Sequence, residues 1–330
     1  MLRKIDWESQ IGRRIRLRDL HVFSAVVRCG SMAKAARELG VSQPAVSEVI
    51  ADLEHMLGVR LLDRGPHGVV STMYGAALFK RSGTVFDELR QSIRDIEFLS
   101  DPTVGELRIG CVESLSATIL AESVLQFSRQ FPRVAINVDN LTPPAIDLPG
   151  LRERKYDCIL CWATGPGVDL HLDDLNIEML FDDKMVVAAG TDSPWARRRR
   201  IGLAELVDEP WILPPPRTWG HAYLEEAFRA QGLDVPKATL VSFSIDLRTR
   251  LLAAGPYITV FTTSVMRRLR AELRTVARLP IELSPPPRPA AALVTLKNRT
   301  LSPLVQQFVK CVRAAAPRST SRHRPKGTGW

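Results

Sequence analysis

The stretch Leu39-Gly-Val-Ser-Gln-Pro-Ala-Val-Ser47 decides the fold of the N-terminal part of this 330-residue chain. Gly40-Val41 can form a turn, and Ser42 can cap a helix with Pro44 in its first turn, where a missing N–H group costs nothing. Apolar residues then recur at helical spacing, at Val46, Val49, Ile50, Leu53 and Leu57. The spacing therefore predicts a helix over residues 42–57 with one buried face.

Two further helices are predicted before this one. The first ends at Gly30, and its apolar face is formed by Leu20, Phe23, Val26 and Val27. Ser31 can cap the second. Its inner positions are Ala35, Ala36 and Leu39. The small residues among them let another helix cross closely. Two helices joined by a short glycine turn, the second opened by Ser-Gln-Pro, form a helix-turn-helix arrangement.

The outer face of the helix over residues 42–57 begins with Gln43, Ser47, Glu48 and Ala51. Short side chains there allow close approach to a DNA major groove, and a glutamine can pair with N6 and N7 of adenine. Glu48 has two interpretations: it accepts a hydrogen bond from a cytosine N4 amino group, or it faces solvent beside the groove. Because Asp52 and Glu54 add further acid, phosphate attraction is expected from the basic N-terminal extension and from Lys34, Arg37, Arg60 and Arg64.

Net charge alone does not establish nucleic-acid binding. The chain has 45 Lys and Arg against 36 Asp and Glu, which gives a formal charge of +9. Residues 1–18 hold six cations against two acids, and the C-terminal stretch has cations without acids at Arg313, Arg318, Arg322, Arg324 and Lys326. Both tails are expected to project from the folded body, with residues 317–330 disordered. The charge is compatible with phosphate binding without demonstrating it.

The composition and the cysteines indicate a cytoplasmic protein. The chain has no run of about 18 apolar residues, as a membrane span requires, and residues 1–18 lack the apolar core of a secretory signal. Five scattered cysteines do not suggest a disulfide framework. Cys158 and Cys161 form a C-x-x-C within a predicted buried strand, where they point to opposite faces. We therefore expect buried packing there, with no metal and no cofactor.

No catalytic constellation is recognisable. The six histidines form no H-E-x-x-H motif or paired metal spacing, and the chain has no nucleophile elbow and no glycine-rich phosphate loop after a strand. We expect no catalytic residue and no enzyme. Two alternatives stay open at this point: an enzyme that binds DNA, and a solute-binding transport protein built from the C-terminal half.

The pattern changes after Gly105. Helical periodicity extends from Leu17 to Leu99, and residues 100–105 resemble a hinge. Beyond it, short β-branched runs alternate with helical stretches, which predicts a parallel or mixed sheet with crossover helices. The expected strands are 106–112, 134–138, 158–160, 185–187, 257–261 and 292–296.

The chain resembles the LysR family of transcriptional regulators nearly without interruption from residue 17 to residue 75. The matching segments are Leu17–Phe23, Gly30–Ala36, Leu39–Ser47, Leu53-Glu54, Leu57–Arg64 and Ser71–Gly75. The resemblance implies a wing over 64–70 with Arg64 near phosphate, and Gln43, Pro44 and Ser47 near bases. The expected DNA-binding residues are Ser31, Lys34, Arg37, Ser42, Gln43, Pro44, Ser47, Glu48 and Arg64.

Residues 73–99 are predicted to form a long linker helix. Apolar residues fall on steps of three and four at Leu78, Val85, Leu89, Ile96 and Leu99. They either pack against their own domain or pair two subunits, and the family resemblance implies pairing. By the same resemblance the oligomer is a homodimer or homotetramer on double-stranded DNA, with RNA polymerase as a further candidate partner.

The region after Gly105 resembles the LysR effector domain, a two-lobed α/β fold of the type 2 periplasmic-binding class. Ligands in open α/β sheets bind beyond the carboxyl ends of strands, near helix N-termini. This rule gives the candidates Glu113, Ser114, Leu115, Ser116, Thr142, Trp162, Thr164, Arg217, Thr218, Ser244 and Ile245. The serines and threonines are equally explained as helix caps, and Arg217 either faces solvent or favours a carboxylate or phosphate.

The predicted organisation has six parts. It comprises a basic extension (1–16), an all-α winged helix-turn-helix (17–72), the linker helix (73–99), the hinge (100–105), the effector domain (106–316) and the tail (317–330). Lobe I would hold about 106–180 and 285–316, and lobe II about 181–284.

Residues 195–216 resemble a subgroup with regulators of galactose-binding-protein and protocatechuate genes, which hints at a sugar or an aromatic acid as effector. The expected function is sequence-specific transcriptional regulation controlled by a small, anionic or neutral, metabolite.

Overall fold

The computed structural model of the chain describes residues 15–65, 68–101, 104–142, 148–163, 174–283, 290–297 and 300–317. The chain divides into two compact units, residues 1–94 and 95–330. Each unit is described by itself. The basic extension up to residue 14, the centre of the hinge and the tail from residue 318 lie outside the described residues.

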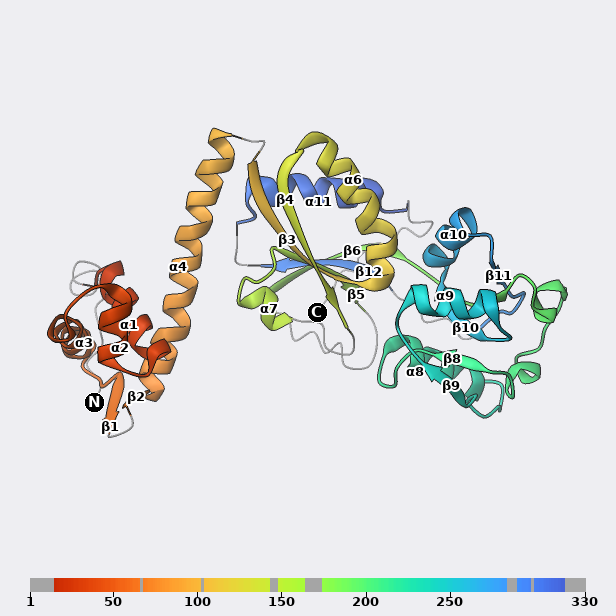
Figure 1. The fold of residues 1–330 in the computed structure, drawn as a ribbon, viewed down its shortest axis with the longest axis horizontal. Coiled ribbons are helices and arrows are strands. Elements are labelled where there is room, and N and C mark those ends of the chain that lie inside the picture. The colour runs from red at the N-terminus through yellow and green to blue at the C-terminus, as the bar shows by residue number, and fades with distance from the viewer. Residues whose placement is uncertain are drawn as a thin grey trace, which may run out of the picture. The chain divides into compact units, whose positions relative to one another are not determined.

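The first unit is a winged helix-turn-helix (Figure 1). Its elements are α1 (Leu17–Cys29), α2 (Met32–Leu39), α3 (Gln43–Leu57), β1 (Leu62–Gly65), β2 (Gly68–Ser71) and the first part of α4 (Met73–Ser100). Gly30, Gly40 and Gly58 end the three short helices with φ near +60°, a conformation that glycine adopts without strain. The core is formed by the predicted apolar faces, with Phe23, Val26, Val46, Ile50 and Leu53 fully buried.

The wing is attached to the helices through its backbone. β1 and β2 pair in an antiparallel hairpin in which Arg64 lies opposite Val69. The N–H of Val69 donates to the carbonyl of Gly30 at 2.9 Å. Gly68 has φ +121°, and a Cβ there would lie 2.4 Å from that same carbonyl oxygen. Only glycine permits this approach, so the wing is held against the turn between α1 and α2.

Glu54 has a structural role that the sequence did not reveal. Its carboxylate accepts hydrogen bonds from the N–H groups of Leu61 and Leu62 at 2.8 and 3.1 Å. Glu54 is half-buried, and the bonds join the end of α3 to the start of the wing. The acid therefore satisfies backbone donors at this corner instead of adding negative charge to the DNA-facing side of α3.

The helix α4 begins against the winged domain. Leu78 and Phe79 are half-buried against its core, and the rings of His21 and Phe86 meet edge-to-face with centroids 5.7 Å apart. Further along, Phe98 is buried in the core of the second unit. Leu78 thus packs against its own domain. Of the two interpretations of the apolar spacing, packing on the own domain therefore holds for this residue.

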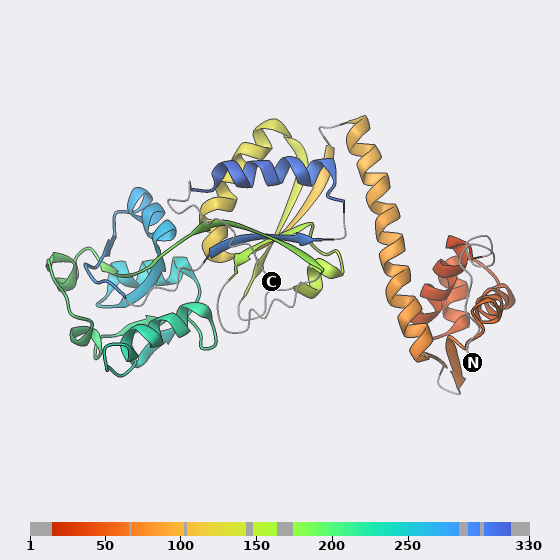
Figure 2. The same ribbon diagram turned by 180° about the vertical axis from the view of Figure 1, so that it is seen from behind.

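Lobe I of the second unit contains the strand order β4-β3-β5-β12-β6. Its strands are β3 (Val104–Val112), β4 (Arg133–Leu141), β5 (Cys158–Trp162), β6 (Leu175–Asp182) and β12 (Ala290–Leu296). β3 is parallel to β4 and β5, and β12 is antiparallel to its neighbours. The helical segments are α5 (Glu113–Leu115), the π-helical turn η2 (Ser116–Leu120), α6 (Ala121–Gln130), α7 (Leu148–Arg152) and α11 (Pro303–Ala315). Figures 1 and 2 show α6 and α11 together over one face of this sheet, where Phe127 meets Phe308.

Lobe II contains the strand order β11-β7-β10-β8-β9. Its elements are β7 (Met185–Gly190), the 3₁₀ turns η3 (Pro194–Arg197) and η4 (Leu203–Leu206), β8 (Trp211–Leu213), α8 (Trp219–Arg229), β9 (Ala238–Val241), α9 (Ile245–Ala254), β10 (Ile258–Thr262), α10 (Thr263–Glu272) and β11 (Val276–Arg278). Alternate residues of β7 belong to different cores: Val187 packs with residues of α8, and Val186 packs with residues of α9 and α10. Helices therefore cover both faces of the sheet, as strand periodicity requires.

The expected strands all form, with bounds that differ by a few residues. β3 begins at Val104, inside the expected hinge, and β6 continues to Asp182, so the chain leaves lobe I at Asp183-Lys184. Four strands were not anticipated: β6, β8, β9 and β11. Three of them are only three or four residues long, too short for a periodic signal.

The C-x-x-C segment is a fully buried strand, as predicted. Cys158 and Cys161 are both buried and free. Burial raises the pKa of the Cys161 thiol to about 12 and also raises the pKa of Cys158. Both thiols therefore stay protonated at neutral pH and pack as small apolar groups. Among the helices within the described ranges, none is both long and apolar enough to cross a membrane.

Two glycines of α4 allow a matched test of the packing between α4 and the wing. A Cβ at Gly75 would lie 2.0 Å from the carbonyl oxygen of Leu61, whereas a Cβ at Gly83 would meet nothing within 4 Å. We expect Gly75→Ala to lower the free energy of unfolding by about 1–3 kcal/mol through overpacking. Gly83→Ala should raise it by about 0.5–1 kcal/mol, because alanine favours helix. Urea unfolding followed by circular dichroism measures both; equal effects would contradict this account of Gly75.

Candidate functional site

The outer face of α3 is free to contact a partner. Gln43, Pro44 and Glu48 are exposed and Ser47 is half-buried, whereas the opposite face of the helix packs into the core. Ser42 is exposed, and its hydroxyl caps α3 by accepting from the N–H of Ala45 at 3.4 Å. The exposed side chains are short or flexible, which suits entry into a groove.

Cations surround this face on neighbouring elements of the same unit. Lys34 and Arg37 on α2 and Arg64 on β1 are exposed. Ser31 caps α2 by accepting from the N–H of Lys34 at 3.4 Å. Ser31 and Ser42 thus both cap helices, as the sequence predicts.

Not every cation near the helix-turn-helix is available. Arg28 donates to the carboxylate of Glu38 at 2.8 Å, and the Sγ of Cys29 donates to the other oxygen of that carboxylate at 3.0 Å. The hydrogen bond from Cys29, together with that from Arg28, lowers the pKa of Glu38. This pair joins α1 to α2, so Arg28 serves the fold, whereas Lys34 and Arg37 of α2 have no ion-pair partner among the described residues.

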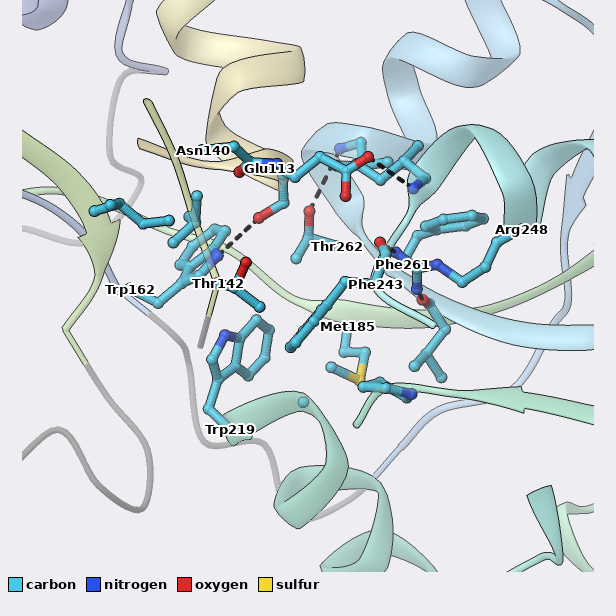
Figure 3. Close-up of a pocket in the computed structure, with 18 residues that line it drawn as sticks. Glu113, Asn140, Thr142, Trp162, Met185, Trp219, Phe243, Arg248, Phe261 and Thr262 are labelled. Carbon is cyan, nitrogen blue, oxygen red and sulfur yellow. Dashed lines mark hydrogen bonds between the residues drawn. The ribbon is translucent and has the colours of Figure 1, made fainter. Parts of the chain in front are cut away.

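A cleft of roughly 700 Å³, partly open to solvent, lies in the second unit. Its walls come from the carboxyl ends of β3, β4 and β5 in lobe I and from α8, α9, β10 and α10 in lobe II. Its lining of apolar and aromatic side chains with a few polar groups suits a small molecule. Figure 3 shows its lining, with Trp162 and Trp219 at one end and Arg248 at the other.

The aromatic end of the cleft is formed by two indole rings. Trp162 on β5 and Trp219 on α8 meet with ring centroids 5.4 Å apart and a tilt of 56°. The Nε1 of Trp162 donates to the Oγ of Ser114 at 2.9 Å, which fixes the orientation of its ring. Phe243 and Met185 add apolar surface to the same space (Figure 3). This end can therefore hold a flat or apolar group.

Glu113 connects the two lobes. It follows β3, and its Oε1 accepts from the backbone N–H of Ile245 at the start of α9, at 2.9 Å. The N-terminus of a helix favours a carboxylate through its free N–H groups and its dipole. In this structure a side chain of the protein itself therefore occupies the anion-favouring end of α9.

Arg248 is the buried cation of the cleft. Only 7% of the residue is exposed, and its guanidinium donates to the carbonyl oxygens of Ser244, Val260 and Phe243 at 3.0–3.3 Å. It also stacks on the ring of Phe261, 4.6 Å from the centroid. Burial lowers the pKa of Arg248 to about 10, an effect that the carboxylate of Glu113 opposes. The group is still protonated at neutral pH and holds the start of α9 against β10.

The sequence candidates divide into those at the cleft and those away from it. Five line it: Glu113, Ser114, Thr142, Trp162 and Ile245. Leu115 is instead in the core of lobe I, and Ser116 lies beside Cys111. Thr218 and Ser244 cap α8 and α9. Thr164 is outside the described residues.

Of the two interpretations of Arg217, its position in the structure matches the one in which it faces solvent. It is exposed, does not line the cleft and has φ +66° in the turn before α8. Its neighbour Thr218 is buried and turns inward to cap the helix. The cation at the cleft is Arg248, in the first turn of α9, three residues after the candidate Ile245.

Several lining residues were missed, on both sides of the cleft. They include Asn140 on β4, Met185, Phe261 and Thr262. Thr262 ends β10 and caps α10, so recognising β10 as a cleft strand would have found it. Met185 has no sequence signal of this kind, since it reaches the cleft only through the arrangement of lobe II.

The C-terminal half of α4 carries an exposed apolar strip. Val85, Leu89, Ile93, Ile96 and Leu99 are 40–67% exposed. Their three- and four-residue steps place them on one face of the helix. Four of the five were expected from the sequence, and Ile93 is an addition. Contiguous apolar surface of this kind marks a contact with another protein surface.

Comparisons with known proteins match both units. A family model described as the LysR substrate binding domain matches residues 100–317, which is more than half of the chain. A second, described as a bacterial regulatory helix-turn-helix protein of the lysR family, matches residues 17–76. The two matches cover the cleft and the face of α3 respectively.

Individual relatives extend over nearly the whole chain. The chain is 25% identical over 311 residues to the uncharacterized HTH-type transcriptional regulator YdcI of Escherichia coli strain K12, covering 94% of this chain and 98% of YdcI. It is 26% identical over 306 residues to the regulator GbpR of Azospirillum brasilense, covering 92% and 87%. A full-length OxyR variant from Pseudomonas aeruginosa has a similar fold, with a TM-score of 0.59, 20% identity and coverage of 94% and 99%. These relatives are regulators rather than enzymes, and the chain belongs to the LysR family of DNA-binding transcriptional regulators with an effector-binding domain.

Proposed function

We propose that α3 reads DNA sequence through Gln43, Pro44 and Ser47, with Glu48 beside them. The observation that carries the proposal is the exposed outer face of α3, whose inner face is fixed by fully buried Val46 and Ile50. Lys34, Arg37 and Arg64 lie on adjoining elements and are suited to phosphate. Phosphate contacts position the domain, and the side chains of α3 specify the sequence.

The cleft is proposed as the effector site. Indole rings at one end suit a flat or apolar group, and polar side chains of Asn140, Thr142 and Thr262 can orient its polar groups. Arg217 does not line the cleft, so it gives no support for an anionic effector. Arg248 provides positive charge at the cleft, but its guanidinium already donates to three carbonyl oxygens. The lining therefore favours an amphipathic small molecule.

Control would follow from preferential binding to one arrangement of the lobes. The contacts between Glu113 and the N–H of Ile245 and between Trp162 and Trp219 each join lobe I to lobe II. A ligand that fits better when these contacts are changed would shift the population toward that arrangement. A ligand with equal affinity for both arrangements would have no effect, however tightly it bound.

The exposed strip of α4 is proposed as the surface that pairs two subunits. A symmetric dimer would present two copies of α3 to neighbouring half-sites. Association of dimers into a tetramer, and contact with RNA polymerase, are further steps of the same proposal. A regulator acting on the chromosome would work in the cytoplasm.

The DNA proposal is tested by separating base contacts from phosphate contacts. In binding-site selection with purified protein, Gln43→Ala should relax preference at one position of each half-site by about tenfold or more. Arg37→Ala should weaken binding to all sequences and reduce its salt dependence while leaving the selected site unchanged. An unaltered site profile for Gln43→Ala would contradict base reading by this residue.

The cleft proposal is tested with two exposed asparagines of lobe I. Asn140 lines the cleft and Asn176 on β6 does not. For ligands found by screening metabolites for a change in tryptophan emission, Asn140→Ala should weaken affinity about three- to tenfold through the loss of a hydrogen bond. Asn176→Ala should leave affinity unchanged. If both variants behave like the parent protein for every ligand found, the site lies elsewhere.

The pairing proposal is tested by placing charge on α4. Ile96→Glu puts a carboxylate in the apolar strip, whereas Thr84→Glu puts the same charge on an exposed position outside it. We expect Ile96→Glu to weaken dimer association at least about tenfold, since the charge would lose its water in the interface. Sedimentation velocity over a dilution series measures this. Equal association of the two variants would remove the strip as the interface.

A further inference from the structure

A cluster of arginines on lobe II has no role in either site described above. Arg267 and Arg270 lie on α10, Arg274 follows the end of that helix, and Arg278 lies on the adjoining edge strand β11. Residues spaced by three or four positions on a helix share one face. Arg267 and Arg270 therefore lie on the same side of α10, and Arg274 follows two residues beyond the last residue of the helix. We call the four the arginine groove.

The groove is concave. Two neighbouring cavities of about 600 and 860 Å³, both partly open to solvent, share Arg270 and Arg278 in their linings. Arg267 and Thr263 line the first, and Arg274 and Thr191 line the second. Buried Val186, Met266 and Val276 form an apolar floor. Neither cavity shares a lining residue with the effector cleft.

No acidic residue of the described chain lines either cavity beside these cations. Within the described parts of the chain, none of the four arginines forms an ion pair. The acid of α10, Glu272, pairs instead with Arg268 at 2.6 Å. The carboxylate of Asp183 accepts from the N–H and hydroxyl of Ser264 and from the N–H of Lys184. Like charges gathered in a concave surface produce a strong positive potential.

The backbone at Arg274 is a second, independent observation. Arg274 has φ +52°, in the left-handed region, directly after α10. This position after a helix is usually glycine, because a side chain there is strained. The strain is accepted here at a residue whose side chain lines the second cavity. Backbone strain of this kind is found at some binding sites.

We propose that the arginine groove binds a small ligand bearing a di- or triphosphate group, at a site separate from the effector cleft. Guanidinium groups hold phosphate oxygens with two parallel hydrogen bonds. Four of them around two joined cavities suit a chain of phosphates better than a single carboxylate. The apolar floor and concave shape favour a compact ligand over the backbone of a DNA duplex.

The groove and the cleft are connected through α10. Thr262 and Val265 at the start of this helix line the cleft, and the next two residues, Met266 and Arg267, line the groove. A ligand that moves α10 would therefore act on both linings. The site thus gives a nucleotide-like anion a route to influence effector binding.

Isothermal titration of the full chain with inorganic triphosphate tests the proposal. The parent protein should bind one triphosphate per chain at physiological ionic strength. Arg270→Gln with Arg278→Gln removes the two residues common to both cavities and should weaken binding about ten- to hundredfold. Arg270→Lys keeps the charge but loses the planar fork, so it should weaken binding by less.

The matched control is Arg199→Gln with Arg200→Gln. These exposed arginines line neither cavity, and their replacement removes the same charge from lobe II. The control should bind triphosphate within twofold of the parent protein, and thermal melting should show all variants folded. Equal weakening by both pairs, or no saturable binding by the parent, would overturn the proposal. So would a result in which non-operator duplex, and not triphosphate, depends on Arg270 and Arg278.

Discussion

A helix can read DNA only if its inner face is held firmly enough that its outer face keeps one position, and the first unit depends on this constraint. Val46, Ile50 and Leu53 of α3 are fully buried against α1 and α2. Burial of each such side chain stabilises the fold by about 1.5–3 kcal/mol. The wing and α4 are then fixed to the same core by backbone contacts at Gly68 and Gly75 that no larger residue permits.

The second unit meets a different constraint, because its cleft contains charges that must be satisfied away from water. Arg248 is stabilised by three carbonyl oxygens and the ring of Phe261, and Glu113 by the start of α9. A buried charge without partners would be costly. The same groups that line the cleft therefore also hold α9 against β10 and lobe I against lobe II, so ligand contact at these residues affects the arrangement of the lobes.

The distribution of charge separates surfaces by role. Cations near α2 and α3 either pair within the fold, as Arg28 does with Glu38, or stay free beside the exposed face of α3. Many surface arginines elsewhere are paired with acids, such as Arg313 with Glu178. The arginine groove differs from these pairs because its cations gather without an acid of the described chain. The net charge of the chain sums all of these cations and acids, so it does not distinguish the paired arginines from the cations near α3 or from the arginine groove.

The sequence by itself determined the winged helix-turn-helix, because helix periodicity, caps and glycine stops are local signals over residues 17–75. It also determined the buried strand with Cys158 and Cys161 and five of the cleft residues, which follow strand ends in lobe I or open a helix of lobe II. Only the tertiary structure decided that Arg248, and not Arg217, is the cation at the cleft, and that Glu54 joins α3 to the wing. Such roles depend on contacts between residues far apart in the chain, and side-chain type and spacing carry no information about which distant backbone group will lie opposite.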